Sequence, residues 1–220
     1  MTDEPENRRP LKVRQAAFAH RLAARLAGAG VHPDTISAAS VAFSVLGAAL
    51  MMTAGGLQGG LGPACWILAA VCIQARLLCN LLDGMVAVEH GKAGPAGPIW
   101  NELPDRVADV LLLAGAGYSA RTAGQPAGEA LGWLAAVLAV MTAYVRELGR
   151  GLGLPADFSG PMAKQQRMAV LTAFCLASAV EPLWRGRGAT MVCGLLLIAA
   201  GCVVTLVKRT GTIAARLRER

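Results

Sequence analysis

Charged residues and aromatic residues are both scarce in this chain of 220 residues. Only 16% of the residues are charged and 5% are aromatic, whereas 55% are hydrophobic. A soluble domain carries about 25% charged residues, so this composition suits a surface that is largely hidden from water. The apolar content excludes an intrinsically disordered chain. The 26 Gly and 11 Pro follow no fixed period, which excludes a collagen-like repeat.

Several functional motifs are also missing. The six cysteines all lie in apolar runs, where they are typical of small hydrophobic residues rather than of a disulfide scaffold. We find no Gly-rich phosphate loop, no dinucleotide-binding fingerprint and no Ser-His-Asp order. The basic residues form no patch interleaved with aromatic residues, so nucleic acid is not a predicted partner.

The apolar residues gather into six runs of helical length. Residues 35–75 contain no charge and are interrupted only by a Gly-rich turn at 55–63, which gives helices near 35–54 and 63–87. A helix needs about 20 apolar residues to cross a bilayer. We therefore predict an all-α fold, a six-helix transmembrane bundle over residues 35–208. The remaining runs lie near 105–121, 129–146, 167–181 and 188–208, and the fifth is short.

The segments outside the bundle are polar and basic. In residues 10–27, Leu11, Phe18, Leu22 and Leu26 recur near helical spacing among Lys and Arg residues. This pattern predicts an amphipathic helix on an anionic membrane surface, with an ordinary solvated arm as the alternative. Residues 1–34 are thus a basic tail with a surface helix, and residues 209–220 are a second basic tail.

The basic residues are distributed unevenly between the two sides of the predicted membrane. Seventeen Lys and Arg fall on the side of the N-terminus, against three (Arg121, Arg185 and Arg187) on the other side. Cytoplasmic loops carry such an excess. We predict that both termini and the site described next face the cytoplasm, in a bacterial inner membrane whose lipid headgroups attract the net charge of +7.

Polar residues form a stripe at the end of the second run. Arg76, Asn80, Asp83 and Ala87 follow the spacing i, i+4, i+7, i+11, which aligns them on one helix face. Charged groups at membrane depth are costly and indicate function. Gly84 lies beside Asp83 and lets a ligand approach the backbone.

A second stripe opens the third run. Glu102, Asp105 and Asp109 follow the spacing i, i+3, i+7 and can face the first stripe. The carboxylates outnumber the bases that we expect at this depth, which favours a hard divalent cation, Mg²⁺ or Mn²⁺. The alternative is a structural ion-pair network that includes Arg76 and Arg106.

At these residues the sequence resembles the CDP-alcohol phosphatidyltransferases, whose signature is D-x2-D-G-x2-A-R-x8-G-x3-D-x3-D. The segment Asp83-Gly84-x2-Ala87 matches its first half, and Asp105-Arg106-Val107-Ala108-Asp109 matches its closing D-x3-D. The segment Pro33-Asp34-Thr35-Ile36-Ser37, which leads into the first apolar run, is similar to the family's Pro-Asn-x-Ile-Thr. The family's six-helix membrane fold with a preceding surface helix agrees with the predicted layout.

The signature is divergent. Asn80 replaces its first aspartate, Val88 replaces its arginine, and the connection to the second half is longer. An ungapped register would instead place Asn101 and Asp105 in the last two positions. We prefer the gapped register that ends at Asp109.

The resemblance implies transfer of a phosphatidyl group from CDP-diacylglycerol to an alcohol, with release of CMP, in phospholipid biosynthesis. It implies a homodimer among membrane lipids and two Mg²⁺ or Mn²⁺ ions, with Asp109 as the general base. The implied metal ligands are Asn80, Asp83, Asp105 and Asp109, with Glu102 as a possible further ligand. The implied nucleotide-binding residues are Asp83, Gly84 and Ala87.

Three cations close the fourth run or open the fifth. Arg146, Lys164 and Arg167 can point at the acidic site, where they favour a phosphorylated acceptor such as glycerol 3-phosphate or an inositol phosphate. The alternative is that they only mark the cytoplasmic side. For the whole chain, the alternative functions are a non-catalytic relative that binds nucleotide-lipid and a small transporter.

Overall fold

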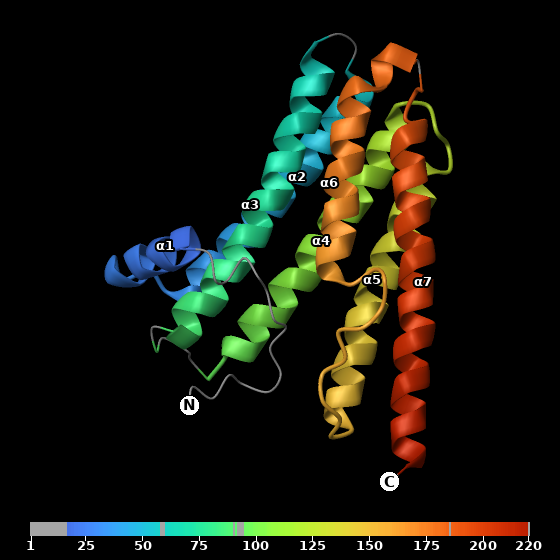
Figure 1. Cartoon of the computed structure of the whole chain (residues 1–220). Coiled ribbons are helices and arrows are strands. Elements are labelled where there is room, and N and C mark those ends of the chain that lie inside the picture. The colour runs from blue at the N-terminus through green and yellow to red at the C-terminus, as the bar shows by residue number, and fades with distance from the viewer. Residues whose placement is uncertain (1–16, 58–59, 90, 92–94, 185, 220) are drawn as a thin grey trace.

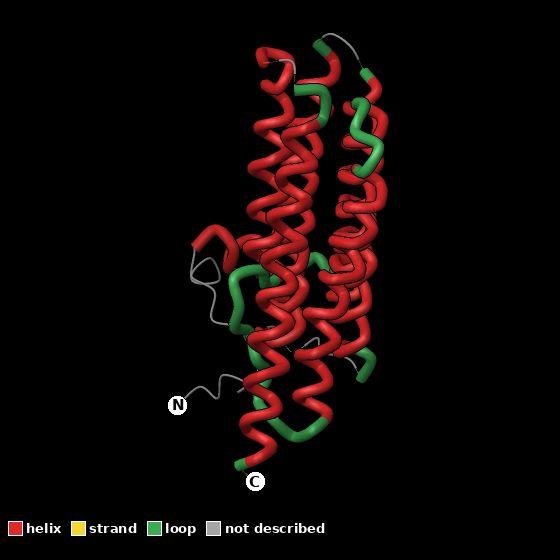
Figure 2. Tube along the Cα trace, turned by 90° about the vertical axis from the view of Figure 1, so that its right-hand side faces the viewer, coloured by secondary structure: helices red, strands yellow, loops and turns green. Residues whose placement is uncertain are grey.

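The computed structural model describes residues 17–57, 60–89, 91, 95–184 and 186–219, and this part of the chain consists of helices and their connecting loops. Figure 2 shows helices and connecting loops in this part, with no strand. The prediction of an all-α fold is confirmed for these residues. The elements are α1 (Ala17–Gly28), α2 (Pro33–Gly56), α3 (Leu61–Glu89), α4 (Gly97–Thr122), α5 (Gly128–Gly151), α6 (Lys164–Val180), the 3₁₀ turn η2 (Glu181–Trp184) and α7 (Ala189–Arg218).

The helices α2 to α7 each cover one predicted apolar run, and local sequence explains their ends. Proline at the first helical position is favoured because its missing N–H needs no partner there, and α2 begins at Pro33. His32 caps this end, because its Nδ1 accepts a hydrogen bond from the Asp34 N–H at 3.4 Å. At the other end of the chain, Arg216 and Arg218 lie in the last turn of α7, where cations complement the helix dipole.

The six long helices pack side by side in a closed order (Figure 1). Helix α2 packs on α3 and α4, α3 packs on α6, α6 on α7, α7 on α5, and α5 on α4. Neighbours in the chain run in opposite directions, so α2, α4 and α6 begin at the same end of the bundle at which α3, α5 and α7 finish. We call this end the polar end.

Within the described residues, four helices (α2, α3, α5 and α7) are long and apolar enough to cross a membrane. The helix α4 carries four charged residues in its first half, and α6 has only 17 residues, or about 26 Å of helix. These two features keep α4 and α6 out of that set. The structure thus provides four candidate spans, and the count of six stays a prediction.

The helix α1 lies across the long helices beside α3 (Figure 1). It buries Ala19 and Ala23 in a cluster with Leu82 and Met85 of α3, while Phe18 is exposed. Residues 10–16 of the predicted surface helix lie outside the described residues. The role of α1 at a membrane surface stays a prediction.

Most of the predicted C-terminal tail at 209–220 is helical, and its place in the cytoplasm stays a prediction. Helix α7 continues to Arg218, and Arg209 is buried, with only 3% of its surface exposed. Its Nη1 donates to the carbonyl oxygen of Thr142 at 2.7 Å, and its Nε donates to that of Ser159 at 2.9 Å. The partners on α5 and in the following loop were not visible in the sequence, which shows Arg209 only as a basic residue after an apolar run.

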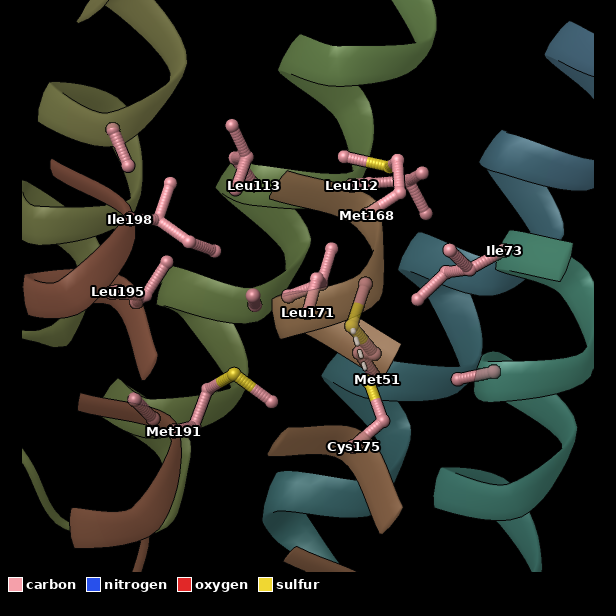
Figure 3. Packing of buried hydrophobic residues seen from close by; sticks show 14 of the residues in the cluster. Met51, Ile73, Leu112, Leu113, Met168, Leu171, Cys175, Met191, Leu195 and Ile198 are labelled. Carbon is pink, nitrogen blue, oxygen red and sulfur yellow. Dashed lines mark hydrogen bonds between the residues drawn. The ribbon is translucent and has the colours of Figure 1, made fainter. Parts of the chain in front are cut away.

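The middle of the bundle is apolar. Figure 3 shows buried side chains of this cluster packed together, among them Met51, Ile73, Leu112, Leu171 and Ile198. Where α4 meets α5, Gly117 and Gly132 bring the backbones into contact, because a Cβ on Gly132 would lie 2.7 Å from the Cα of Gly117. Such close approach of small residues is the usual way in which membrane helices associate.

Candidate active site

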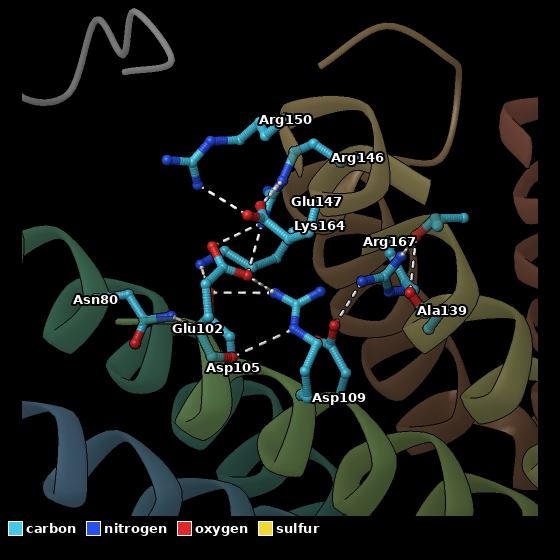
Figure 4. A network of polar contacts seen from close by, with 12 residues as sticks. Asn80, Glu102, Asp105, Asp109, Ala139, Arg146, Glu147, Arg150, Lys164 and Arg167 are labelled. Carbon is cyan, nitrogen blue, oxygen red and sulfur yellow. Dashed lines mark hydrogen bonds and ion pairs between the residues drawn. The ribbon is translucent and has the colours of Figure 1, made fainter. Parts of the chain in front are cut away.

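The two predicted stripes face each other at the polar end of the bundle. The Asn80 side-chain amide on α3 donates to Oδ1 of Asp105 on α4. Asp105 and Asp109 are buried, whereas Asn101 is exposed. Both registers of the signature include Asp105, so the choice between them stays a prediction. Side chains from α5 and α6 complete the site (Figure 4).

Arg76 links the two helices from inside the bundle. Its side chain is fully buried. Its Nη2 donates to Asp105 Oδ1 at 3.3 Å, to the Asp105 carbonyl oxygen at 3.2 Å and to Asp109 Oδ1 at 3.2 Å. Its Nε and Nη1 have no hydrogen-bond partner in the described structure. Arg76 is therefore a fixed internal cation between the two aspartates of α4.

Asp109 is held by two guanidinium groups. Nη2 of Arg76 donates to Oδ1 of Asp109, and Nη2 of Arg167 on α6 donates to Oδ2 of Asp109 at 2.5 Å. Arg167 also donates to the carbonyl oxygen of Met162 at 3.3 Å, which ties α6 to the preceding loop. Both side chains are essentially inaccessible to water. Asp109, the predicted general base, thus lies at the site, and both of its carboxylate oxygens accept hydrogen bonds.

Asp105 forms ion pairs with cations from three helices. Besides Arg76 on α3, Nζ of Lys164 on α6 contacts its Oδ2. Arg106 on α4 lies 3.4 Å from the same oxygen. The side chain of Lys164 is 28% exposed and that of Arg106 is 17% exposed, so both can leave Asp105 for another anion near the surface.

Glu102 faces α5 and is paired there. Nη2 of Arg146 lies 2.6 Å from both of its carboxylate oxygens. The Arg146 Nε donates to Glu147 Oε1 at 2.9 Å, and its guanidinium lies 5.5 Å from the ring centre of Phe158. The three predicted acceptor-binding cations therefore reach the site, and each is matched there with an acid.

Asp83 differs from the other acids. Its Oδ2 accepts a hydrogen bond from Ser37 Oγ on α2 at 2.6 Å, while its Oδ1 is buried without a hydrogen-bond partner in the described structure. Ser37 lies in the segment that resembles the family's entry, but its role here needed the packing of α2 on α3. Gly84 and Ala87 are half-buried beside Asp83.

The charges at the site balance more closely than the sequence suggested. Among the described residues, no three Asp, Glu, His or Cys side chains lie close enough together to hold a metal ion. The expectation that carboxylates outnumber bases is wrong, because packing adds Lys164 and Arg167 of α6 to Arg76. One oxygen atom still suits a hard cation as a ligand, because Asp83 Oδ1 is a buried carboxylate oxygen without a hydrogen-bond partner in the described structure.

Two sequence relatives are membrane or lipid proteins. The chain is 28% identical over 204 residues to phosphatidylinositol phosphate synthase of Mycobacteroides abscessus, covering 88% of this chain and 82% of that enzyme. It is 26% identical over 154 residues to the inner membrane protein YnbA of Escherichia coli K12, covering 70% of this chain and 71% of YnbA. No protein-family model matches the chain.

The fold is similar to solved structures of phosphatidylinositol phosphate synthase from Mycobacterium tuberculosis. The structure with CDP-DAG bound matches with a TM-score of 0.72 at 20% identity, covering 90% of this chain and 94% of that chain. The structure in complex with manganese and citrate matches with a TM-score of 0.69 at 20% identity, covering 89% and 88%. At this identity the match shows a shared fold.

Fold and site together define a helical integral membrane protein with an ionic site buried at one end. The sequence relatives and the shared fold confirm the resemblance to the CDP-alcohol phosphatidyltransferases that the signature residues indicated.

Proposed function

We propose that this protein transfers a phosphatidyl group from CDP-diacylglycerol to an alcohol and releases CMP. The observation that carries the proposal is the meeting of Asp83, Asp105 and Asp109 with Lys164 and Arg167 at one end of an apolar bundle. A substrate with acyl chains in the bilayer and a charged head at its surface suits this position. The names of the relatives and the fold match support the same reaction.

Two cations of the site are placed where they can bind a phosphate group. Lys164 and Arg146 are partly exposed, and they pair with Asp105 and with Glu102 and Glu147, respectively. A phosphate oxygen that enters would compete for these donors through charge-assisted hydrogen bonds. Asp109, whose two oxygens lie on Arg76 and Arg167, would accept the proton of the acceptor hydroxyl.

The other substrate groups have matching surroundings. Gly84 and Ala87 present little side chain beside Asp83, so the cytidine nucleotide can lie against α3 there. A divalent ion at Asp83 would neutralise charge on the pyrophosphate as the bond to CMP breaks. Mg²⁺ and Mn²⁺ both suit these oxygen donors, and the manganese-bound match supports this class of ion.

The acceptor that we propose is a phosphorylated alcohol, with an inositol phosphate first and glycerol 3-phosphate second. Three cations at the site exceed what a neutral alcohol needs, and the relatives that share most of this chain are named phosphatidylinositol phosphate synthases. A non-catalytic relative that binds nucleotide-lipid is the second candidate. The neutral Asn80 and the close pairing of Asp105 and Asp109 with cations favour it.

One assay separates these candidates. Purified protein with CDP-diacylglycerol and Mn²⁺ or Mg²⁺ should release CMP when an inositol phosphate is added, and release less with inositol. Release with none of a panel of alcohols, together with retained binding of CDP-diacylglycerol, would establish the non-catalytic alternative. The Asp83→Asn variant in the same membrane preparation is the matched control.

We further propose that the chain has six spans and sits as a homodimer in a bacterial inner membrane, with the polar end and both termini in the cytoplasm. The excess of seventeen basic residues to three supports this orientation. Reporter domains fused after Arg121 and after Arg185 should be detected outside the cytoplasm. A cytoplasmic signal at either position would contradict the topology.

A further inference from the structure

A cavity lies at the end of the bundle opposite to the polar end. Its volume is about 900 Å³. It is lined by the last residues of α2, α4 and α6, the first residues of α3 and α7, and the turn η2. In Figure 1 this end lies far from the C-terminus. We call this space the distal cavity, and its size falls in the range of about 300–1,000 Å³ that is usual for ligand pockets.

Two polar side chains that line the distal cavity have atoms without partners. Ser178 in the last turn of α6 is 2% exposed, and its Oγ has no hydrogen-bond partner in the described structure. Glu181 is 7% exposed, and its Oε1 accepts a hydrogen bond from the Thr190 N–H at 3.0 Å. Among the described residues, no hydrogen bond or ion pair reaches its other oxygen, Oε2. A hydroxyl oxygen and a carboxylate oxygen thus remain for a ligand.

These two side chains lie on the same side of the chain. The Glu181 N–H donates to the Ser178 carbonyl oxygen. This is the hydrogen bond of a 3₁₀ turn, in which side chains three residues apart are eclipsed. One ligand group can therefore reach both of them.

The charged residues on the lining of the distal cavity have opposite signs. In the described part of the chain they are Glu181 and Arg187. The backbone next to Arg187 approaches the carboxylate closely, because a Cβ on Gly186 would lie 2.4 Å from Glu181 Oε1. Arg187 is exposed and forms no ion pair with Glu181 or with any other acid that the structure describes. The lining therefore offers one acid and one base to a ligand, and its net charge is zero.

This charge pattern matches a zwitterion that carries an ammonium group and a phosphate group. An ammonium donates to carboxylate and hydroxyl oxygens, and the partial negative charge at the C-terminal ends of α2, α4 and α6 favours a cation in the same cavity. A phosphate pairs with an arginine through charge-assisted hydrogen bonds. A divalent metal ion is a poorer match, because it needs several oxygen ligands and the described lining has a single carboxylate.

The surroundings of the cavity favour a lipid as the carrier of this zwitterion. Leu57, Leu61 and Leu183 lie on the lining or next to a residue that lines it, and they are between 38% and 84% exposed. Exposed apolar side chains that gather beside a polar cavity are typical of a binding site. Acyl chains that stay in the bilayer would contact them while the headgroup enters the cavity.

We propose that the distal cavity binds the phosphoethanolamine headgroup of a membrane phospholipid. Its ammonium group lies on Glu181 Oε2 and Ser178 Oγ, and its phosphate lies on Arg187. This site is separate from the polar end and does not depend on the transfer reaction proposed above.

The test measures lipid binding to the full chain in detergent by native mass spectrometry. Phosphatidylethanolamine and phosphatidylglycerol with the same acyl chains are compared, because the second lipid has the phosphate but no ammonium group. Glu181→Gln keeps the oxygen that accepts from Thr190 and removes the charge. It should raise the Kd for phosphatidylethanolamine by about tenfold or more, as expected when a hydrogen bond to a charged group is lost. It should not raise the Kd for phosphatidylglycerol.

Matched variants and a soluble competitor sharpen the test. Arg187→Gln should raise the Kd for both lipids, since both carry phosphate. Arg121→Gln removes a cation that pairs with Glu129 and does not line the cavity, so it should leave both Kd values unchanged. Soluble phosphoethanolamine should displace the lipid only at concentrations far above the Kd of the lipid. Displacement at equal concentration would overturn the lipid as the ligand and identify a free molecule instead.

Two further results would overturn the inference. One is an unchanged Kd for phosphatidylethanolamine in folded Glu181→Gln, and the other is an equal rise of this Kd in Arg121→Gln. If Glu181→Gln does not fold, Ser178→Ala decides, because it removes only the unpartnered hydroxyl. Ser178→Ala should raise the Kd for phosphatidylethanolamine by about threefold or more, and an unchanged Kd would refute the site.

Discussion

Along α4 the interior of the protein changes from ionic to apolar within about one turn of helix. Asp105 and Asp109 are buried among arginine and lysine side chains (Figure 4), whereas Leu112 and Leu113 are buried among methyl groups (Figure 3). All four of these residues are buried. Burial alone therefore does not distinguish the site from the core.

The difference lies in what burial does to stability. Apolar side chains pack favourably wherever they fit, but each buried ion costs several kcal/mol in lost hydration unless a partner offsets it. Arg76 keeps two donor groups without hydrogen bonds in the described structure, so its partners offset this cost incompletely. The polar end thus contains a buried cluster of ions that packing alone would not favour. This unfavourable cluster is the physical basis for assigning function to the polar end.

The largest effect should follow from removing a carboxylate that holds the ion. Asp83→Asn and Asp105→Asn should each abolish divalent-dependent CMP release, because too few charged oxygens remain beside the nucleotide. Activity assays across a range of Mn²⁺ concentrations measure this loss, with the thermal unfolding temperature as the control for folding. Full activity of Asp83→Asn with unchanged metal dependence would refute the metal assignment.

A large but smaller effect is expected for the proposed base. Asp109→Asn should lower kcat by about 10²–10⁴-fold, the usual contribution of a general base. Its affinity for CDP-diacylglycerol should fall less than that of Asp83→Asn, because Asp109 has no free oxygen in the described structure. Equal losses of binding and turnover would make Asp109 mainly a ligand.

A moderate effect should come from two cations of the site, Arg146 beside Glu102 and Arg167 beside Asp109. Arg146→Ala and Arg167→Ala should raise KM for a phosphorylated acceptor by about tenfold or more, since a hydrogen bond to a charged group contributes about 1.5–3 kcal/mol. KM for CDP-diacylglycerol should change much less. Arg150→Ala is the matched control, because Arg150 pairs only with Glu147 in the described structure. If KM for the acceptor were unchanged in both variants, these cations would not bind the acceptor and would only mark the cytoplasmic side.

The smallest effect on chemistry should come from the apolar middle. Gly132→Leu should push α5 from α4 and lower stability by about 1–3 kcal/mol, the usual result of overpacking. Gly151→Leu on the same helix has open space around it and should change stability little. Thermal unfolding in detergent measures both, and kcat of the folded fraction should stay near the wild-type value. If Gly132→Leu abolished kcat without changing stability, the separation between core and site would be wrong.

Much of the fold could be predicted because its signals are local. Runs of apolar residues, the Gly-rich turn at 55–63 and Pro33 mark where the long helices begin and end. The end of α7 was missed because Arg209 lies among polar residues in sequence. Its partners, Thr142 and Ser159, belong to other segments and make it part of the interior.

The sequence by itself determined the helices, the two polar stripes and the identity of the acids that meet there, because a spacing of three to four residues fixes which side chains share a helix face. Only the tertiary structure decided how these acids are neutralised. Which cation reaches which carboxylate depends on α6 packing beside α3 and on the depth of Arg76, and no local spacing records contacts between distant segments. Those contacts turned a predicted surplus of carboxylates into a paired network, and they made Arg76 a fixed part of the site.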